Sequence, residues 1–319
     1  MSILDARGVS VRYPVRGGVL QRPTAWIRAV DGVDIALEAG ETLGLVGESG
    51  SGKSTLGRAL IALRRPDEGE IRFHGEDILA LEGARLKALR KRMQIVFQDP
   101  NASLDPRRTV GGSVRMGLDL HGVGDRAARA AAVMEMFRRV GLRPEHAGRF
   151  PHEFSGGQRQ RIGIARALIL NPEVLVCDEA VSALDVSVQA QILNLLKDLQ
   201  AERRLAMLFI SHNLAVVEHM ADRIAVMYAG RIVEDAPREV LFAAPAHPYT
   251  RTLLSAVPTP DPTRRDPAPP PLGEPPDPAN LPSGCRFRSR CPIAMPRCAE
   301  EEPALVPVAP AHRAACWAA

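Results

Sequence analysis

A glycine-rich segment at residues 47–54, Gly-Glu-Ser-Gly-Ser-Gly-Lys-Ser, has the residue types and spacing needed to hold a phosphate chain. It follows an apolar run at 42–46, which predicts a buried strand, and residues 55–63 have the apolar spacing of a helix start. Glycines let successive backbone N–H groups turn toward a phosphate, and the N-terminus of the following helix adds partial positive charge. Strand, loop and helix together predict a nucleotide-binding P-loop, in which Lys53 reaches the β- and γ-phosphates and Ser54 binds Mg²⁺.

Four further polar segments lie at the ends of predicted strands or at the start of a helix. Gln98 follows an apolar run at 93–97, Asp178-Glu179 ends a run at 174–177, and His212 follows a run at 205–210. Ser155–Gln158 leads into a helix predicted at 162–170. Alternating helices and apolar strands predict an α/β fold with a mainly parallel sheet, whose ligands bind at the C-terminal ends of the strands.

The composition is that of a soluble globular protein. Of 319 residues, 45% are hydrophobic and 24% are charged, which supplies enough apolar area for a full core. The sequence has no run of about 18 uncharged apolar residues, so no membrane-spanning helix is expected. Its first residues lack the pattern of a secretory signal, which favours a cytoplasmic location. The net charge of +4 does not favour nucleic acid as a partner.

Three regions lie outside this pattern of strands. The segment 14–28, which contains Trp26, is punctuated by Gly and Pro and is predicted to be a loop. Residues 101–166 are predicted to be helical, with 126–140 as the clearest amphipathic helix. Residues 258–282 carry eleven prolines, which predicts an extended linker or a surface arm. We therefore expect a domain at 1–257, a proline-rich linker at 258–284 and a tail at 285–319.

The order of these motifs resembles that of the nucleotide-binding subunits of ABC transporters, and the resemblance covers residues 3–257. The motifs that carry it are Gly47–Ser54, Gln98, Ser155–Gln158, Asp178-Glu179, Ser182–Asp185 and His212. The resemblance implies a P-loop NTPase core, the ABC ATPase fold, with a helical subdomain inserted at about 101–166. It also implies ATP and Mg²⁺ as ligands and ATP hydrolysis as the activity.

The resemblance assigns a task to each motif. Asp178 is expected to hold Mg²⁺ through its water shell, together with Ser54 and Gln98. Glu179 is the carboxylate expected to accept a proton from the attacking water, and His212 is expected to contact the γ-phosphate. A purine base would stack on Tyr13, although an exposed strand-end tyrosine without a ligand is the alternative. The expected ATP-binding residues are Tyr13, Gly47, Ser49, Gly50, Ser51, Gly52, Lys53, Ser54, Thr55 and Gln98.

In this family the signature Ser155-Gly156-Gly157-Gln158 completes the ATP site of a second subunit, and Asp185 faces that partner. Backbone donors and a helix N-terminus would be directed at the γ-phosphate. The usual first residue of the signature is Leu, whereas this chain has Phe154, a mild departure at an apolar position. The resemblance therefore implies a pair of ATPase subunits with two ATP molecules between them.

A finer resemblance is to the dipeptide and oligopeptide importers, in particular to the second, "F"-type, of their two ATPase subunits. The segments that carry it are Gly40–Gly44, Phe97–Pro106, Cys177–Asp185 and His247–Thr250. It implies a peripheral subunit at the cytoplasmic face of the membrane, with two permease subunits, a second ATPase chain and, indirectly, a substrate-binding protein as partners. Importers of nickel or glutathione share many of these features. A soluble ABC ATPase acting on DNA or ribosomes is a competing class, but the long coiled-coil insertions or second ATPase domain usual there are absent from this sequence. A small P-loop kinase would need neither the signature nor His212.

The tail holds four cysteines, Cys285, Cys291, Cys298 and Cys316. Because structural disulfides are disfavoured in the cytoplasm, clustered thiols suggest a metal. The close Cys pairs of zinc modules are missing, and the Cys291-Pro292 step is similar to the one in ferredoxin-type ligation. Interleaved arginines would offset the charge of thiolate ligands. We expect a [4Fe–4S] cluster, with zinc and no metal as the alternatives.

Overall fold

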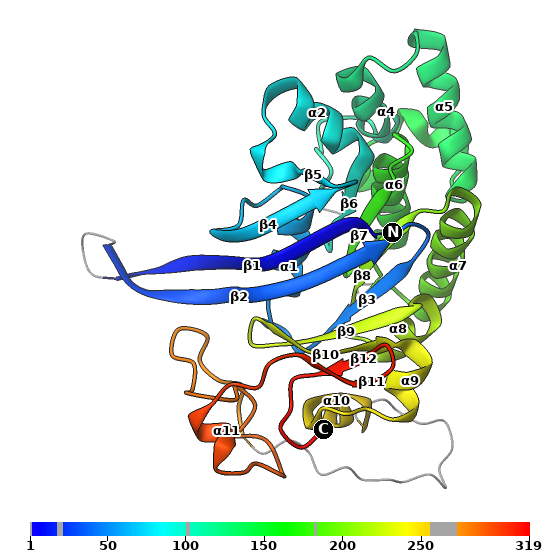
Figure 1. Cartoon of the computed structure of the whole chain (residues 1–319). Helices are drawn as coiled ribbons and strands as arrows, with labels where there is room; N and C mark the ends of the chain where they lie inside the picture. Colours follow the sequence, from blue (N-terminus) through cyan, green and yellow to red (C-terminus); the bar gives the residue numbers. More distant parts are fainter. Residues whose placement is uncertain (1, 18–21, 100–102, 182–183, 256–272) are drawn as a thin grey trace, which may run out of the picture. The chain divides into compact units, whose positions relative to one another are not determined.

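The computed structural model describes residues 2–17, 22–99, 103–181, 184–255 and 273–319. The chain divides into two compact units, which we call the helical unit and the P-loop unit. The helical unit contains Met1–Ile3, Leu37–Thr42 and Glu76–Ile210, and the P-loop unit contains Leu4–Ala36, Leu43–Gly75 and Ser211–Ala319. Figure 1 labels the elements of both units.

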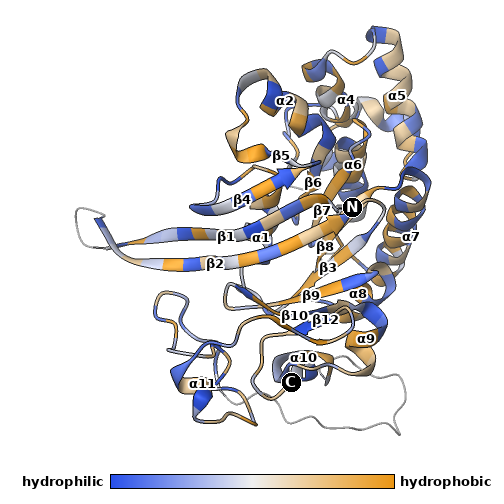
Figure 2. Ribbon diagram, in the orientation of Figure 1, coloured by the Kyte–Doolittle hydropathy of each residue, from blue (hydrophilic) through white to orange (hydrophobic). Residues whose placement is uncertain are grey.

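In the helical unit, three parallel strands carry the core. Their order is β6–β7–β8, and every residue of β7 and β8 is buried. The residues of β8 are all hydrophobic and are coloured accordingly in Figure 2. The elements of this unit are β5 (Glu76–Asp77), η1 (Ile78–Ala80), α2 (Gly83–Arg92), β6 (Met93–Val96), α4 (Val110–His121), α5 (Arg126–Arg139), η2 (Pro144–Gly148), η3 (Pro151–Glu153), α6 (Gly156–Leu168), β7 (Val174–Asp178), α7 (Val186–Arg203) and β8 (Ala206–Ile210).

Helix α6 joins the helices of this unit to its strands. It contacts α4, α5, β6 and α7. Its residues Ile162 and Ile164 are fully buried, and α5 contributes the buried Phe137. A fully buried aromatic or aliphatic side chain of this size contributes on the order of 2 kcal/mol to folding. The predicted amphipathic helix at 126–140 is present as α5, with Asp125 as its N-cap.

The P-loop unit contains a mixed sheet. Strand β3 is parallel to β9, whereas β9, β10, β12 and β11 follow one another in antiparallel order. Strands β2, β1 and β4 form a second sheet, in which β1 and β4 are antiparallel. The elements that belong wholly or mostly to this unit are β1 (Ser2–Gly17), β2 (Arg22–Glu38), β3 (Thr42–Val46), α1 (Lys53–Leu60), β4 (Glu68–Phe73), α8 (Leu214–Met220), β9 (Arg223–Tyr228), β10 (Arg231–Pro237), α9 (Arg238–Ala243), α10 (Pro248–Ser255), α11 (Arg297–Glu300), β11 (Val306–Ala309) and β12 (His312–Ala314).

The segment 14–28 differs from the predicted loop. Strand β1 continues to Gly17 and β2 begins at Arg22, so most of this segment is extended, with residues 18–21 outside the described part. The Thr24 hydroxyl donates to the Val15 carbonyl at 3.1 Å, which links the two strands. Proline is tolerated where a strand has no partner on one side, because the missing N–H then faces away from the ladder. Strand β2 is at the edge of its sheet, and the pairing of β1 with β4 ends at Ser10, before Pro14. Pro14 and Pro23 therefore do not end these strands, although they suggested a loop.

The C-terminal residues from 285 onward fold within the P-loop unit. Strand β12 pairs with β10, and His312 contacts Glu234 of β10 at 2.7 Å between side-chain atoms. Both of these side chains are buried. Among the described residues, none of the helices combines the length and the hydropathy that crossing a bilayer requires.

Candidate functional site

The P-loop is shaped by glycines that no other residue can replace. Gly47 follows the buried strand β3, and Gly52 caps helix α1. Their φ angles of +150° and +105° lie in the region that favours glycine. A Cβ at Gly47 would overlap the Met227 carbonyl oxygen, and one at Gly52 would overlap the Ala29 carbonyl oxygen. The chain thus has the strand, the tight loop and the helix N-terminus of a phosphate cradle, and these residues fit a nucleotide.

Lys53 is folded back over this loop. Its ammonium group donates hydrogen bonds to the carbonyl oxygens of Gly47 and Glu48, both at 2.8 Å, and its side chain is buried. Residues 48–51 border a cavity of about 420 Å³, with further walls from 27–29, 228–230 and 274–281. The cation of Lys53 is therefore held at the loop that the sequence predicted to bind phosphate.

Tyr13 and His212 belong to the same unit as the P-loop. Tyr13 is an exposed residue of β1, and the Arg64 guanidinium lies over its ring at 5.3 Å from the centroid. His212 is exposed in the turn between β8 and α8. The preceding Ser211 is buried, and its hydroxyl accepts a hydrogen bond from the N–H of Asn213, the N-cap of α8.

The predicted carboxylates lie at the end of β7 in the helical unit. Asp178 is fully buried, and Glu179 has a φ of +48°, a strained conformation for a residue with a side chain. The Glu179 N–H donates to the Ile210 carbonyl at 3.0 Å, and the Gln98 amide donates to the Glu179 carboxylate at 2.8 Å. The structure therefore brings Gln98 and Glu179 together, 81 residues apart in the sequence.

The signature residues begin helix α6. Ser155 is its N-cap, with the hydroxyl accepting from the Gln158 N–H at 3.3 Å and the Gln158 amide oxygen accepting from the Ser155 N–H at 3.0 Å. Ser155 and Gly156 are exposed, whereas Phe154 is buried and packs its ring against His146. Phe154 thus occupies a buried apolar position.

A cavity of about 510 Å³ joins the signature to the start of α7. It is lined by Ser155–Gln158 and by Asp185, which caps α7 by accepting from the Val188 N–H at 2.9 Å. This hydrogen bond is the largest cause that lowers the pKa of the exposed Asp185 carboxyl. A Cβ at Gly157 would lie 2.7 Å from Val188, so close packing of the two helices needs glycine there. Ser182 and Ala183 lie outside the described residues.

The four tail cysteines lie around one small cavity of about 10 Å³. All four are free thiols, and burial raises the pKa of Cys285 and Cys291, with smaller contributions from the neighbouring thiols. Within the described residues, no group of three or more His, Cys, Asp or Glu side chains is arranged to hold a metal ion. The structure thus brings together the four cysteines that the sequence singled out, but not in a ligating geometry.

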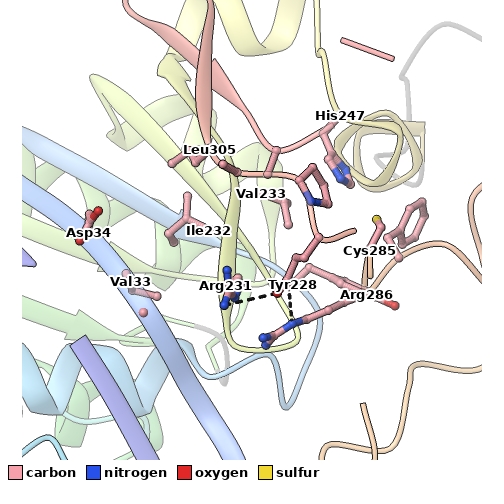
Figure 3. Close-up of a pocket in the computed structure, with 16 residues that line it drawn as sticks. Val33, Asp34, Tyr228, Arg231, Ile232, Val233, His247, Cys285, Arg286 and Leu305 are labelled. Carbon is pink, nitrogen blue, oxygen red and sulfur yellow. Dashed lines mark hydrogen bonds and ion pairs between the residues drawn. The ribbon is translucent and has the colours of Figure 1, made fainter. Parts of the chain in front are cut away.

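A larger cavity of about 260 Å³ lies beside these cysteines. Figure 3 shows its wall, with Cys285 and Arg286 from the tail, Tyr228 from β9 and Arg231 from β10. Arg231 and Arg286 both contact Glu302, at 3.3 and 2.8 Å. The positive charges of this wall are thus compensated within it.

Comparisons with known proteins place these features in a family. Residues 30–182 match the family described as ABC transporter, and residues 233–298 match the C-terminal region of oligopeptide/dipeptide transporters. The chain is 50% identical to the oligopeptide transport ATP-binding protein AppF of Bacillus subtilis, over 99% of this chain and 97% of that protein. The chain belongs to the ABC transporter ATP-binding proteins. It is an ATPase of this family.

Other relatives differ in name and in length. A probable peptide ABC transporter ATP-binding protein of Sinorhizobium fredii is 51% identical over 99% of this chain and 89% of its own length. The glutathione import ATP-binding protein GsiA of Salmonella paratyphi A is 57% identical over 83% of this chain but only 42% of its own length. Among solved structures, the dimeric cassette MJ0796 of a bacterial ABC transporter matches with a TM-score of 0.67 at 28% identity, covering 74% of this chain and 98% of that one. The ABC ATPase fold with its mixed sheets is thereby confirmed.

The sequence did not single out Glu48, Tyr249 and Arg290. Glu48 is the second residue of the P-loop, and both other side chains hydrogen-bond to it. Tyr249 is part of the segment 247–250 that supported the importer resemblance, and Arg290 is one of the arginines between the tail cysteines. Those two patterns were the available signals, but neither names Glu48 as the partner.

Proposed function

We propose that this ATPase powers the import of dipeptides or oligopeptides through a separate membrane permease. The proposal is carried by the P-loop with its glycine cradle, in a chain that is 50% identical to the oligopeptide transport ATP-binding protein AppF over 99% of this chain. The match of residues 233–298 to the oligopeptide/dipeptide transporter C-terminal region supports the peptide cargo.

The P-loop unit supplies most of the proposed ATP contacts. The backbone of the loop and Lys53 bind the phosphates, Tyr13 stacks on the base, and His212 hydrogen-bonds the γ-phosphate. When bound, Mg²⁺ neutralises phosphate charge, and Ser54, Gln98 and Asp178 are the residues proposed to hold it. The hard oxygen donors of these three side chains suit this ion.

Glu179 is proposed as the general base for the attacking water. A base must keep a fixed position and an acceptor oxygen, and the hydrogen bond from Gln98 to one carboxylate oxygen orients it. The positive φ of Glu179 is consistent with a position imposed by function, because strained backbone conformations cluster at active sites. Gln98 is proposed to report the nucleotide state to the partner subunits.

We further propose that the chain works as one of a pair of ATPase subunits. The signature is exposed at the start of α6 and shares a cavity with Asp185, as a surface that completes the partner's ATP site would. A helix N-terminus with exposed N–H groups suits a phosphate. The proposed assembly has a second, different ATPase chain, two permease subunits and an indirect contact with a substrate-binding protein, at the cytoplasmic face of the membrane.

The domain organisation is proposed as an ATPase domain at 1–257 with a helical subdomain at about 101–166, a proline-rich linker at 258–284 and a cysteine-rich tail at 285–319. Helices α4, α5 and α6 support the helical subdomain. Most of the linker, residues 258–272, lies outside the described part of the chain.

We also propose that Cys285, Cys291, Cys298 and Cys316 bind a [4Fe–4S] cluster, with zinc as the alternative. The support is that all four thiols line one cavity, although their present arrangement does not hold a metal. Anaerobically purified protein is then expected to be brown and to contain about four iron and four sulfide per chain, and Cys298→Ser to lose both. Stoichiometric zinc without iron would refute the cluster, and four freely alkylated thiols would refute both metals.

A second cargo is favoured by one observation, the 57% identity to a glutathione import ATP-binding protein over 265 residues. An uptake assay distinguishes peptide from glutathione as the cargo. It uses cells that lack their own peptide and glutathione importers and that express this chain with its permease and binding protein. Uptake of a labelled tripeptide or pentapeptide, competed by other peptides and not by glutathione, supports peptide import. Uptake of glutathione alone would contradict it, and uptake of neither would contradict the transport function.

A further inference from the structure

The P-loop of this chain contains an acidic residue close to where ATP must bind. Glu48 directly follows Gly47, and its side chain is 29% exposed. The phosphates of ATP bring several negative charges to such a loop. A carboxylate without a partner at this position would therefore oppose nucleotide binding by charge repulsion.

Two side chains from distant parts of the sequence hold Glu48. Arg290 donates two parallel hydrogen bonds to its carboxylate oxygens, at 2.8 and 2.9 Å. The Tyr249 hydroxyl accepts a hydrogen bond from the Glu48 backbone N–H at 2.7 Å. The first contact neutralises the charge in the favourable two-point geometry, and the second fixes the backbone of the loop.

Arg290 is held in place by aromatic rings. Its guanidinium lies 5.8 Å from the ring centroids of Tyr228 and Phe287, and it also donates to the Tyr228 hydroxyl at 3.3 Å. The Arg290 side chain is only 5% exposed. Arg290 is therefore the buried partner of this ion pair, and its removal would leave the Glu48 carboxylate without its compensating charge.

A second arginine is linked to the P-loop by hydrogen bonds of the turn at 229–230. Arg286 pairs with Asp31 and with Glu302 and donates to the Ala229 carbonyl at 2.6 Å. The next residue, Gly230, donates its N–H to the Ser51 carbonyl at 3.0 Å. Figure 3 shows Arg286 beside Tyr228 and Cys285. The segment 285–291, which begins and ends with a cysteine, thus contacts the loop directly and through this turn.

We propose that Arg290 is a positioning residue for ATP binding, which neutralises Glu48 and thereby makes the affinity of the P-loop for ATP depend on the folded cysteine-rich segment 285–291. This inference rests on the proposed function in one respect, that the P-loop binds ATP. It assigns to the C-terminal region a task at the nucleotide site, in addition to its packing within the P-loop unit. Because Arg290 directly precedes Cys291, a change in the conformation of this segment is transmitted to Glu48.

The test measures the dissociation constant of a fluorescent ATP analogue with the purified full-length chain. We expect Arg290→Ala to weaken binding about tenfold, the effect of one uncompensated charge in a partly exposed setting. Adding Glu48→Gln to Arg290→Ala removes that charge and is expected to restore binding to within about threefold of wild type. Arg290→Lys keeps the charge but loses the two-point geometry, so an intermediate affinity is expected.

Arg297→Ala is the matched control. Arg297 also pairs with a carboxylate, donating two hydrogen bonds to the Oε2 atom of Glu301 at 3.1 and 3.0 Å, but its side chain is 56% exposed. Its removal is expected to leave the affinity unchanged. Unchanged affinity in Arg290→Ala would overturn the inference, and so would a double variant that binds as weakly as Arg290→Ala, since the loss is then structural. If Arg290→Ala does not fold, Arg290→Lys with wild-type affinity would overturn it. Failure of the wild-type chain to bind the analogue would instead contradict the proposed function.

Discussion

Replacing His247 is expected to remove a defined part of the pH dependence of stability. His247 is buried just before α10, and its Nδ1 accepts a hydrogen bond from the Tyr249 N–H at 3.0 Å. Burial, with a smaller contribution from Arg251, lowers the pKa of His247 from 6.5 to about 4. The folded state therefore keeps this imidazole neutral, and its Nδ1 is free of a proton so that it can accept the bond.

The sign and size of the effect follow from this difference in pKa. As the pH falls below 6.5, the unfolded chain takes up a proton at His247 that the folded chain does not bind. The stability contribution is complete above pH 6.5 and is lost progressively as the pH falls toward 4. Between pH 7 and pH 5, a pKa of 6.5 in the unfolded state and about 4 in the folded state changes the free energy of unfolding by about 2 kcal/mol.

Urea denaturation of wild type and His247→Asn at pH 7 and pH 5 measures this contribution. The asparagine oxygen can accept the bond from the Tyr249 N–H but does not titrate. Trp317 lines the same small cavity as His247, so tryptophan fluorescence reports on this region. Between pH 7 and pH 5, we expect the free energy of unfolding of His247→Asn to fall by about 2 kcal/mol less than that of wild type. His152→Asn, at an exposed position, is expected to show the same fall as wild type. Equal losses in wild type and His247→Asn would refute the reasoning.

The other predictions concern the nucleotide sites. Lys53→Ala removes the cation that is held over the P-loop and is expected to weaken ATP binding at least tenfold in a fluorescent-nucleotide titration; unchanged affinity would contradict the assignment of the loop. Ser155→Arg places a bulky cation at the exposed signature, so we expect unchanged ATP binding by the isolated chain and strongly reduced hydrolysis by the assembled transporter. Loss of ATP binding in the folded, isolated variant would place Ser155 in the chain's own site.

Local sequence patterns predicted the elements that carry the candidate site. The run at 42–46 is β3, the strand predicted at 174–179 is β7, which ends at Asp178, and the helix after the P-loop is α1. These segments combine continuous apolar runs with glycine turns, which leave few conformations open. The helix predicted from 162 begins at Gly156, because the side chains of Ser155 and Gln158 cap it six residues earlier.

Local sequence patterns do not predict contacts between residues that are far apart in the sequence. Glu48 and Arg290 are 242 residues apart, and neither residue type identifies its partner. The prolines and glycines of the segment 14–28 favour a loop, whereas Pro14 lies in β1 and Pro23 in β2, both of which are extended there. The four tail cysteines line one cavity, but among the described residues they are not arranged to hold a metal ion, and their spacing in the sequence does not reveal this geometry. The roles assigned to the individual site residues stay predictions.

The most direct test of the account is peptide uptake driven by the complete transporter carrying Glu179→Gln in this chain. The substitution keeps the hydrogen-bonding shape of the side chain but removes its ability to accept a proton. The account predicts that this chain still binds ATP with an affinity close to that of wild type, while hydrolysis at its site and uptake of labelled peptide both fall by about two orders of magnitude or more. Hydrolysis and uptake at wild-type rates would contradict the central claim that Glu179 is the base of a transport ATPase.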